Sequence, residues 1–310
     1  MKVYFGIEEF NQLDSAVVTS GTFDGVHLGH QKILSRVNEL CKNNISESVL
    51  ITFHPHPRVV IEGDHKLHLL STIDEKIELL EKTGLNHLLI IPFNREFSEL
   101  SSEEFIHKIL IDTIGTRKLV IGYDHRFGKN REGGFEYLKA NSEKYGFEVE
   151  EIPRQDIENV GISSSKIRTA LLAGDVVLAQ ENLGKSYMIS GTVVKGKQLG
   201  RTIGFPTANI QTPENHKLIP LNGVYAVEVI YQNQTFGGVM NIGNRPTVDG
   251  TFRTLEVNIF NFDAEIYGEK LAVNFIERIR DEQKFSSLEL LKHQILIDKN
   301  KAIQILKTLN

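Results

Sequence analysis

The sequence predicts an α/β domain followed by an all-β domain, and three observations support that prediction. Up to about residue 180, apolar strand-like runs alternate with segments of helical periodicity, which is the pattern of a doubly wound parallel sheet. After residue 184, short strands separated by Gly, Asn and Asp turns predict an antiparallel β-barrel with one terminal helix. A length of 310 residues also exceeds what one hydrophobic core usually serves. We therefore expect domains over residues 1–183 and 184–310.

In the first half, each expected strand is followed by an expected helix. The strands are expected at residues 16–20, 48–53, 87–92, 118–123 and 147–152. The helices are expected at residues 31–41, from the capping box Thr72-x-x-Glu75 to near Gly84, from the capping box Ser101-x-x-Glu104 onward, and at 134–145. The carboxyl ends of parallel strands lie at one edge of such a sheet, where ligands bind.

The second half contains short strands and one long amphipathic segment. Strands are expected at residues 191–194, 224–231, 236–241, 254–260 and 271–276, with a hairpin tip at 231–235. Ser286-x-x-Glu289 is a capping box that predicts the start of the terminal helix. The apolar stripe of this helix, which should pack on the barrel, comprises Leu288, Leu291, Ile295, Ala302, Ile305 and Leu309. Gly184-Lys185-Ser186 resembles the end of a phosphate-binding P-loop, but Ala179 occupies the required first glycine position and the segment follows a helical run. Gly184 is better interpreted as a helix C-cap.

Composition is that of an ordinary globular protein. The chain is 40% hydrophobic and 24% charged, and no apolar run approaches the ~18 residues of a membrane helix. The first residues lack the apolar core of a signal peptide, so we expect a cytoplasmic protein. The single cysteine, Cys41, excludes an internal disulfide and a thiolate zinc cluster, and should be a packing residue. A net charge of −5 argues against a general nucleic-acid partner, so any anion site must be local.

The most informative motif directly follows the first of these strands, at residues 21–30, with the sequence GTFDGVHLGH. Its histidines, His27 and His30, are three positions apart, so both rings can point the same way at the start of a helix. Gly29 between them lets a phosphate approach the backbone, and the helix N-terminus adds N–H groups and partial positive charge. The motif predicts a triphosphate site. The alternative is a helix-capping turn with one core histidine.

Residues 52–57, with the sequence TFHPHP, follow the next strand. We expect an extended loop there, imposed by the two prolines and lining a ligand cleft. A metal site built from His54 and His56 with His65 and His68 is the alternative. It is disfavoured because no carboxylate or thiol completes a ligand set.

Residues 121–131, with the sequence IGYDHRFGKNR, follow another strand end. Asp124 is placed to orient a ribose or a polar group of a flavin, and Phe127 to stack on a ring. The cations of this segment, which suit phosphate, are Arg126, Lys129 and Arg131. The alternative interpretation is a solvated polar loop.

Residues 163–168, with the sequence SSSKIR, open a helix. Their hydroxyls, including those of Ser163 and Ser164, and the Arg168 cation predict a second anion site. Together with the two histidines, this suits adenylyl transfer, in which an acceptor phosphate attacks the α-phosphate of ATP. No protein nucleophile is needed, because positioning of the reactants and neutralisation of the phosphate charge are sufficient to accelerate the reaction.

The segment 191–210 combines glycines, cations and oxygen donors. Its glycines at 196, 200 and 204 permit a flexible loop over phosphates, with Lys195, Lys197 and Arg201 as cations. Thr207 and Asn209 alternate on an extended segment, so both side-chain oxygens can face one Mg²⁺ and the nucleotide. A glycine-rich hairpin loop is the alternative.

Taken together, the 21–30, 52–57 and 162–168 motifs are similar, in order, to the three adenylyltransferase signatures of the bifunctional riboflavin kinase/FMN adenylyltransferase family. The segments 191–210, 240–247 and 255–262 resemble the kinase signatures of that family, so the resemblance covers nearly the whole chain. It implies an N-terminal nucleotidyltransferase domain and a C-terminal riboflavin kinase barrel. The implied reactions convert riboflavin and ATP to FMN, and FMN and ATP to FAD and pyrophosphate.

The resemblance also implies residue roles. Glu256 is implied as the general base for the riboflavin 5′-hydroxyl, although by charge alone it is an exposed strand residue. His27 and His30 are implied to act on the ATP phosphates during adenylylation. The other implied ATP-binding residues are Thr22, Phe23, Gly29, Ser163, Ser164, Arg168, Gly196, Lys197, Gly204, Pro206, Thr207 and Asn209, with Thr207 and Asn209 also binding Mg²⁺. The implied flavin-binding residues are His56, Asp124, Phe127, Arg131, Asn241 and Arg278.

Three positions depart from the family pattern, and they affect the tuning of the sites. His125 stands where Phe is frequent, Gly134 where an acidic residue is frequent, and Asn258 where His is usual.

Rival hypotheses remain. One is transfer to another acceptor, such as phosphopantetheine, nicotinamide mononucleotide or an amino acid destined for tRNA. Another is a flavin-sensing regulator without chemistry. The flavin-type barrel and the acidic balance disfavour the first, and the joint presence of the catalytic residues disfavours the second. We expect small-molecule substrates, no nucleic-acid or membrane partner, and a monomer or weak oligomer.

Overall fold

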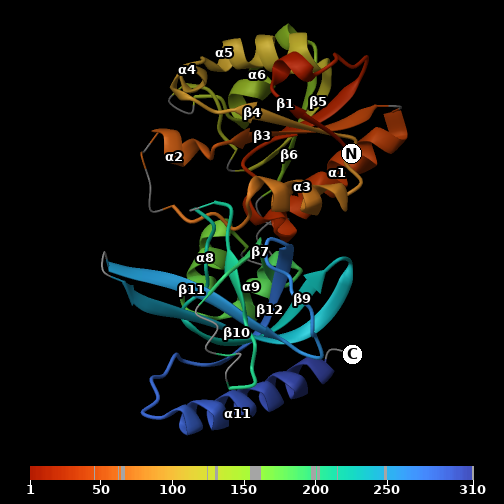
Figure 1. The fold of residues 1–310 in the computed structure, drawn as a ribbon. Helices are drawn as coiled ribbons and strands as arrows, with labels where there is room; N and C mark the ends of the chain where they lie inside the picture. Colours follow the sequence, from red (N-terminus) through yellow and green to blue (C-terminus); the bar gives the residue numbers. More distant parts are fainter. Residues whose placement is uncertain are drawn as a thin grey trace. The chain divides into compact units, whose positions relative to one another are not determined.

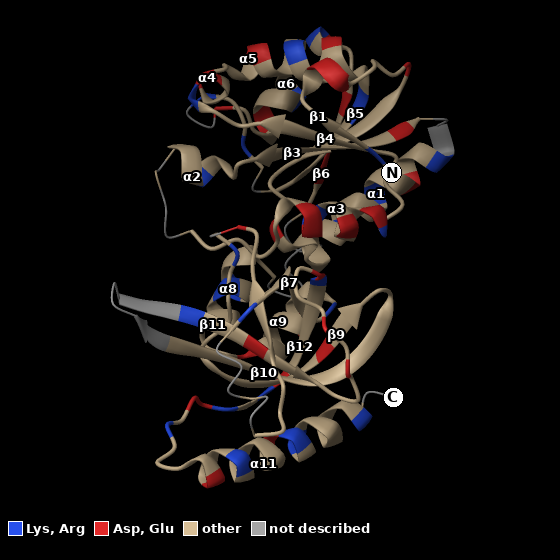
Figure 2. Cartoon of the chain, in the orientation of Figure 1, with Lys and Arg blue, Asp and Glu red and all other residues tan. Residues whose placement is uncertain are grey.

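The computed structural model describes residues 1–44, 46–61, 63, 67–123, 125–129, 132–153, 162–196, 200, 203–214, 216–247 and 250–308. Backbone contacts divide the chain into two units, Met1–Ser163 and Ser164–Asn310 (Figure 1). Charge of both signs is distributed over the elements of each unit, with α3 mostly acidic and α11 mostly basic (Figure 2).

The first unit contains a six-stranded parallel sheet with the strand order β1-β4-β3-β2-β5-β6. Its strands are β1 (Lys2–Phe5), β2 (Ala16–Ser20), β3 (Glu47–His54), β4 (His87–Pro92), β5 (Thr116–Gly122) and β6 (Glu148–Ile152). This confirms the predicted doubly wound parallel sheet. Strand β1 and the 3-10 helix η1 (Ile7–Glu9) were not predicted, because β1 is a short edge strand with no alternating apolar pattern.

The helices of the first unit are α1 (Leu28–Asn44), α2 (Pro57–Ile61), α3 (Ile73–Glu81), α4 (Arg95–Ser98), α5 (Ser102–Phe105), the π-helix η3 (Ile106–Ile114) and α6 (Phe135–Tyr145). Three of them, α3, α4 and α5, start at side-chain caps, which are Thr72, Asn94 and Ser101. The capping boxes at Thr72 and Ser101 are both confirmed. The extended loop expected through Pro57 is wrong at its end, since Pro57 begins α2. Proline is well suited to a first helical position because that position needs no N–H donor.

Alternate residues of the parallel strands serve two apolar cores, one on each face of the sheet. Val18, Ile51 and Leu89 belong to one core and Val17, Leu50 and Leu88 to the other. Cys41 lies in the second core, and burial raises the pKa of its thiol to about 11. This confirms the expectation that Cys41 is a packing residue.

The second unit is a closed antiparallel barrel with the strand order β10-β11-β8-β7-β12-β9. Its strands are β7 (Tyr187–Val194), β8 (Ala208–Gln211), β9 (Gly223–Tyr231), β10 (Gln234–Thr247), β11 (Gly250–Ile259) and β12 (Lys270–Arg280). The predicted barrel is confirmed. The hairpin tip is confirmed as well, since Gln232 and Asn233 both have positive φ, as a two-residue turn requires.

Among the described residues of this unit, α8 (Ser164–Leu172) and α9 (Val176–Leu183) precede the barrel and α11 follows it. Helix α9 ends at Gly184, whose left-handed backbone confirms the predicted C-cap. Helices α8 and α9 belong by their contacts to the second unit: the Leu221 N–H donates to the Leu171 carbonyl, and α9 contacts β7 and β12. That the two activities divide between residues 1–183 and 184–310 stays a prediction.

The terminal helix α11 (Leu288–Lys307) packs on β9, β10 and β12. Its N-cap is Ser287 rather than the predicted Ser286, and Leu288 is 61% exposed, so it does not belong to the packed stripe. Ala302 of that stripe is buried. A buried carboxylate, Asp298, accepts hydrogen bonds from the Arg280 guanidinium at 2.7 to 3.1 Å and ties the helix to β12.

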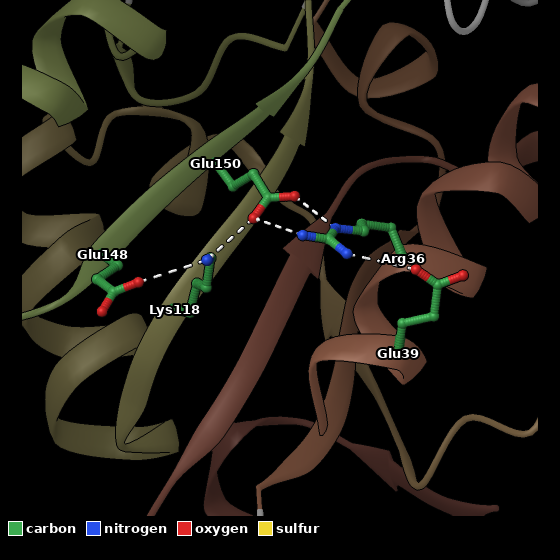
Figure 3. A network of polar contacts seen from close by, with 5 residues as sticks. All are labelled: Arg36, Glu39, Lys118, Glu148 and Glu150. Atoms are coloured by element: carbon green, nitrogen blue, oxygen red, sulfur yellow. Dashed lines mark hydrogen bonds and ion pairs between the residues drawn. The ribbon is translucent and has the colours of Figure 1, made fainter. Parts of the chain in front are cut away.

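A polar network joins α1, β5 and β6 in the first unit (Figure 3). Glu150 pairs with Arg36 at 2.6 Å and with Lys118 at 2.9 Å. Lys118 also lies 3.4 Å from Glu148, and Arg36 lies 3.4 Å from Glu39. Partial burial alone raises the pKa of Glu150, but the hydrogen bonds from Arg36 and Lys118 together outweigh it, so the pKa is lowered.

We expect Glu150→Gln to reduce the free energy of unfolding at neutral pH by roughly 1 kcal/mol, because it removes the charge shared by two ion pairs. A carboxyl with a lowered folded pKa stabilises the protein above its unfolded pKa, and that contribution is lost as the pH falls through the folded pKa. Urea unfolding of the full chain at neutral and increasingly acidic pH measures the difference. Glu148→Gln is the matched control. The Glu148 side chain is 68% exposed, so this substitution should leave the free energy of unfolding unchanged. A difference that persists at acidic pH contradicts the prediction.

Candidate active sites

The first candidate site is the turn that follows β2. Ser20 ends this buried strand, and residues 24–26 form the short 3-10 helix η2 before α1 begins at Leu28. Phe23 and Val26 both have left-handed backbones, with φ of 46° and 43°. Such a backbone costs a β-branched residue about 1–3 kcal/mol, and it persists only where surrounding contacts hold it.

The turn brings His27 and His30 into contact. Their rings are stacked, with centroids 3.6 Å apart and planes inclined by 15°, and the Phe23 ring lies 4.6 Å from that of His30. His27 is 6% exposed and caps α1, because its Nδ1 accepts the His30 N–H at 3.3 Å. An accepting Nδ1 places the proton of the neutral ring on Nε2, so that nitrogen is a donor. The predicted alignment of the two rings is confirmed, and Gly29, which precedes His30 in the sequence, is buried.

The turn is held by residues that sequence analysis did not single out for function. The buried Asp24 carboxylate accepts the Leu70 N–H at 2.9 Å and the Ser71 N–H at 3.1 Å. The Thr22 carbonyl accepts the Lys76 ammonium at 2.7 Å and the Thr52 hydroxyl at 3.2 Å. Lys76 directly follows the capping box that opens α3, and that sequence signal indicates only a helix start.

The loop after β5 is tied to the end of β2. His125 Nε2 lies 2.8 Å from the Ser20 hydroxyl, and the His125 ring lies 5.8 Å from Phe127. Phe127 is buried in the core against Phe105, so its predicted contact with a flavin ring stays a prediction. His56 is half-buried, and its Nδ1 accepts the Arg58 N–H at 3.1 Å. Asp124, Arg131 and Lys197 lie outside the residues that the structure describes.

The serine-rich segment opens α8, as predicted, and the helix begins at Ser164. Ser164 and Arg168 are four positions apart on this helix and therefore share one face, while Ile167 is buried. Ser163 immediately precedes the helix and is exposed. The hydroxyl and the guanidinium thus occupy one side of a helix start. That these residues act with His27 and His30 stays a prediction.

The second candidate site lies on the barrel. Strand pairing places Asn209 of β8 opposite Glu256 of β11, and Glu256 opposite Asn241 of β10. Their strand neighbours Ile210, Val257 and Met240 are buried, so the three polar side chains face away from the apolar interior. We refer to Asn209, Glu256 and Asn241 as the polar row.

Thr207 and Gly196, two of the residues predicted to bind ATP, lie close to this row. Thr207 Oγ1 donates to Glu256 at 3.5 Å, and the Pro206 carbonyl accepts the Asn258 amide at 2.7 Å. A side chain at Gly196 would collide with Asn209, because a Cβ there would lie 2.3 Å from its amide nitrogen. Gly204 has a φ of 85°, which favours glycine.

Arg278, another residue predicted to contact flavin, lies on β12 opposite Tyr225 of β9. Its guanidinium donates to the Asn222 carbonyl and to Asp281, both at 2.7 Å, and lies 5.9 Å from the centre of the Tyr225 ring. The neighbouring Arg253 donates to the Asn222 side chain at 2.9 Å. Burial lowers the pKa of Arg253 and raises that of the Tyr225 phenol. Arg278 is therefore a fixed cation in the barrel unit.

The two sites differ in chemistry. The first offers stacked imidazoles at a helix start, which suits a polyanion. The second combines a carboxylate with hydroxyl and amide oxygens, which suits a general base beside a hard cation. Within the described part of the chain, no group of three or more His, Cys, Asp or Glu residues could hold a metal. Of the four residues named for the alternative histidine metal site, His65 lies outside the described residues.

Comparison with known proteins matches both halves of the chain. A family model described as FAD synthetase matches residues 9–166, and one described as riboflavin kinase matches residues 183–306. A bifunctional riboflavin kinase/FMN adenylyltransferase of Buchnera aphidicola is 41% identical and covers 99% of this chain and 98% of its own length. The Escherichia coli K12 protein of the same description is 38% identical over 96% of both chains.

A solved structure has the same fold over nearly the full length. It is described as a macrolide-efflux protein of Streptococcus pneumoniae, is 31% identical, and aligns with a TM-score of 0.86 over 96% of this chain and 97% of that one. In the segments of this chain that the structure describes, no helix is long and apolar enough to cross a membrane.

Proposed function

Because this chain belongs to the family of bifunctional riboflavin kinase/FMN adenylyltransferases, we propose that the polar row and the His27–His30 turn catalyse its two reactions. Riboflavin and ATP give FMN and ADP, and FMN with a second ATP gives FAD and pyrophosphate. The observation that carries this assignment is the pairing register that brings Glu256, Asn209 and Asn241 into one row. Matches to both family models and to full-length bifunctional relatives argue against the rival acceptors and the regulator hypothesis.

In the kinase reaction, Glu256 takes the proton of the riboflavin 5′-hydroxyl while the oxygen attacks the γ-phosphorus of ATP. The bond to the β–γ bridging oxygen breaks, and ADP leaves. Thr207 lies within hydrogen-bond distance of Glu256 and orients its carboxylate. We assign flavin contacts to Asn241 and Arg278 and ATP contacts to Gly196, Lys197, Gly204 and Pro206.

Mg²⁺ is the metal that suits the oxygen donors of this site. Thr207 and Asn209 would hold it, and when bound it would neutralise charge on the transferring phosphates. Mg²⁺ usually takes only one or two protein oxygens together with substrate phosphates, so the small donor set fits it. We expect Thr207→Val to raise the Mg²⁺ concentration needed for half-maximal FMN formation by about tenfold, equivalent to about 1.4 kcal/mol. FAD formation from supplied FMN is the internal control, and an unchanged Mg²⁺ requirement contradicts the assignment.

In the adenylyl transfer, an FMN phosphate oxygen attacks the α-phosphorus of ATP, and pyrophosphate leaves as its bond to that phosphorus breaks. His27 and His30 neutralise and position the ATP phosphates, with Thr22, Phe23 and Gly29 beside them. Ser163, Ser164 and Arg168 are proposed to contact the same phosphates. We assign flavin contacts to His56, Asp124, Phe127 and Arg131. No covalent protein intermediate is required.

Product chromatography after mixing the purified chain with riboflavin, ATP and magnesium tests both reactions together. We expect FMN to appear first and FAD and pyrophosphate to follow. FMN without FAD would remove the adenylyltransferase assignment, and FAD from supplied FMN without any FMN from riboflavin would remove the kinase assignment.

We propose further that the chain acts in the cytoplasm, as a monomer or weak oligomer, on small molecules only. The net charge of −5 supports the absence of a nucleic-acid partner. Sedimentation of the purified chain tests the oligomeric state, and a stable large assembly contradicts this part.

A further inference from the structure

The turn that carries His27 is anchored to a second segment of the chain, far away in sequence. We refer to Leu70, Ser71 and Lys76 as the clamp. Leu70 and Ser71 donate their backbone N–H groups to the Asp24 carboxylate, and the Ser71 hydroxyl accepts the Gly25 N–H at 3.1 Å. These contacts span 46 and 47 positions of sequence. The middle of the turn is therefore fixed from outside.

Lys76 fixes the beginning of the same turn. Lys76 as a residue is 7% exposed, although lysine is rarely buried, and its ammonium donates to the Thr22 carbonyl at 2.7 Å. Burying an ammonium is unfavourable unless hydrogen bonds and nearby charge compensate it. The Lys76 ammonium therefore binds the residue that directly precedes Phe23, and the Phe23 ring packs on His30.

The turn needs these anchors because its backbone is strained. Val26 is β-branched and has a φ of 43°, and His27 follows it directly. Without external contacts this segment would relax toward an ordinary backbone and carry the His27 ring away from His30. The clamp holds the turn on both sides of Phe23: at Thr22 through Lys76, and at Asp24 and Gly25 through Leu70 and Ser71.

We propose that Lys76 is a positioning residue for the adenylyl transfer, which holds the strained 22–26 turn so that His27 and His30 remain aligned. The inference rests on the proposed function of the two histidines. Lys76 acts through Thr22 and the turn. A misplaced phosphate-binding group weakens the transition state more than the bound substrate, so kcat should fall more than the KM for ATP rises.

The test measures FAD formation from FMN and ATP by the full chain carrying Lys76→Met. We expect kcat to fall about 10- to 100-fold, with less than a threefold change in the KM for ATP. Lys76→Arg keeps a charged donor and should retain more activity than Lys76→Met. Lys82→Met, an exposed lysine at the C-cap of the same helix, is the matched control and should behave as wild type. Each variant is assayed at a temperature at which circular dichroism shows that it is folded.

A double-mutant cycle with Val26→Gly separates positioning from simple stability. Glycine removes the strain at residue 26, so Lys76→Met should cost at least threefold less in kcat in that background than in wild type. Equal costs in both backgrounds, or wild-type kcat in Lys76→Met, would overturn the inference. His27→Ala distinguishes a failure of the proposed function of the two histidines from a failure of the inference about Lys76. If it leaves FAD formation intact, the site assignment fails; if it abolishes FAD formation while Lys76→Met does not, only the clamp inference fails.

Discussion

His27→Ala should reduce kcat/KM for FAD formation by about 10²–10³-fold, the cost of removing one preorganised donor from a developing charge. The imidazole is buried against His30 at the start of α1, where its Nε2–H is a donor and the helix terminus adds positive potential. FMN formation from riboflavin should stay within about twofold of wild type, because the polar row lies in the other unit. Coupled detection of pyrophosphate and chromatography of the flavins measure both reactions on the same preparation.

Two variants control this experiment. His27→Asn retains a side-chain acceptor for the His30 N–H, since asparagine is a good N-cap, but it lacks the ring. It should keep the stability of wild type and lose FAD formation as His27→Ala does. His107→Ala removes an exposed histidine of the same unit and should change neither reaction. Retention of FAD formation by His27→Asn would limit His27 to a capping role.

Local sequence signals predicted most of the elements but fewer of the contacts between them. The two capping boxes, the strand 87–92 and the C-cap at Gly184 depend on residues within one helical turn or one strand, and all are confirmed. Adjacent serines offer nearly identical capping groups, so the sequence does not distinguish Ser286 from Ser287 as the N-cap of α11.

Contacts across long loops could not be predicted in the same way. The Lys76–Thr22 hydrogen bond spans 54 positions, and the motif that contains Thr22 says nothing of its partner. The polar row likewise depends on the register of three strands, which barrel closure determines and which local periodicity leaves open. The family motifs indicated which residues matter, whereas tertiary structure determined which of them meet.

The corresponding experiment for the kinase reaction substitutes Glu256 in the barrel. Glu256→Ala should lower FMN formation by about 10²–10⁴-fold, the usual contribution of a general base. FAD formation from supplied FMN should be unchanged. Glu256→Gln is the sharper variant, because it keeps the shape of the side chain and an oxygen for the Thr207 hydroxyl, but cannot accept the riboflavin proton. Its kcat should therefore fall while its KM for ATP stays close to wild type.

The matched control is Glu228→Gln, which neutralises another barrel carboxylate on β9, outside the polar row. It should form FMN at the wild-type rate. If Glu256→Gln also does so, the carboxylate is not the base, and Asn209 and Thr207 would retain only a binding role. If Glu256→Gln instead loses both reactions, the two units are coupled through this strand, and the assignment of one reaction to each unit is wrong.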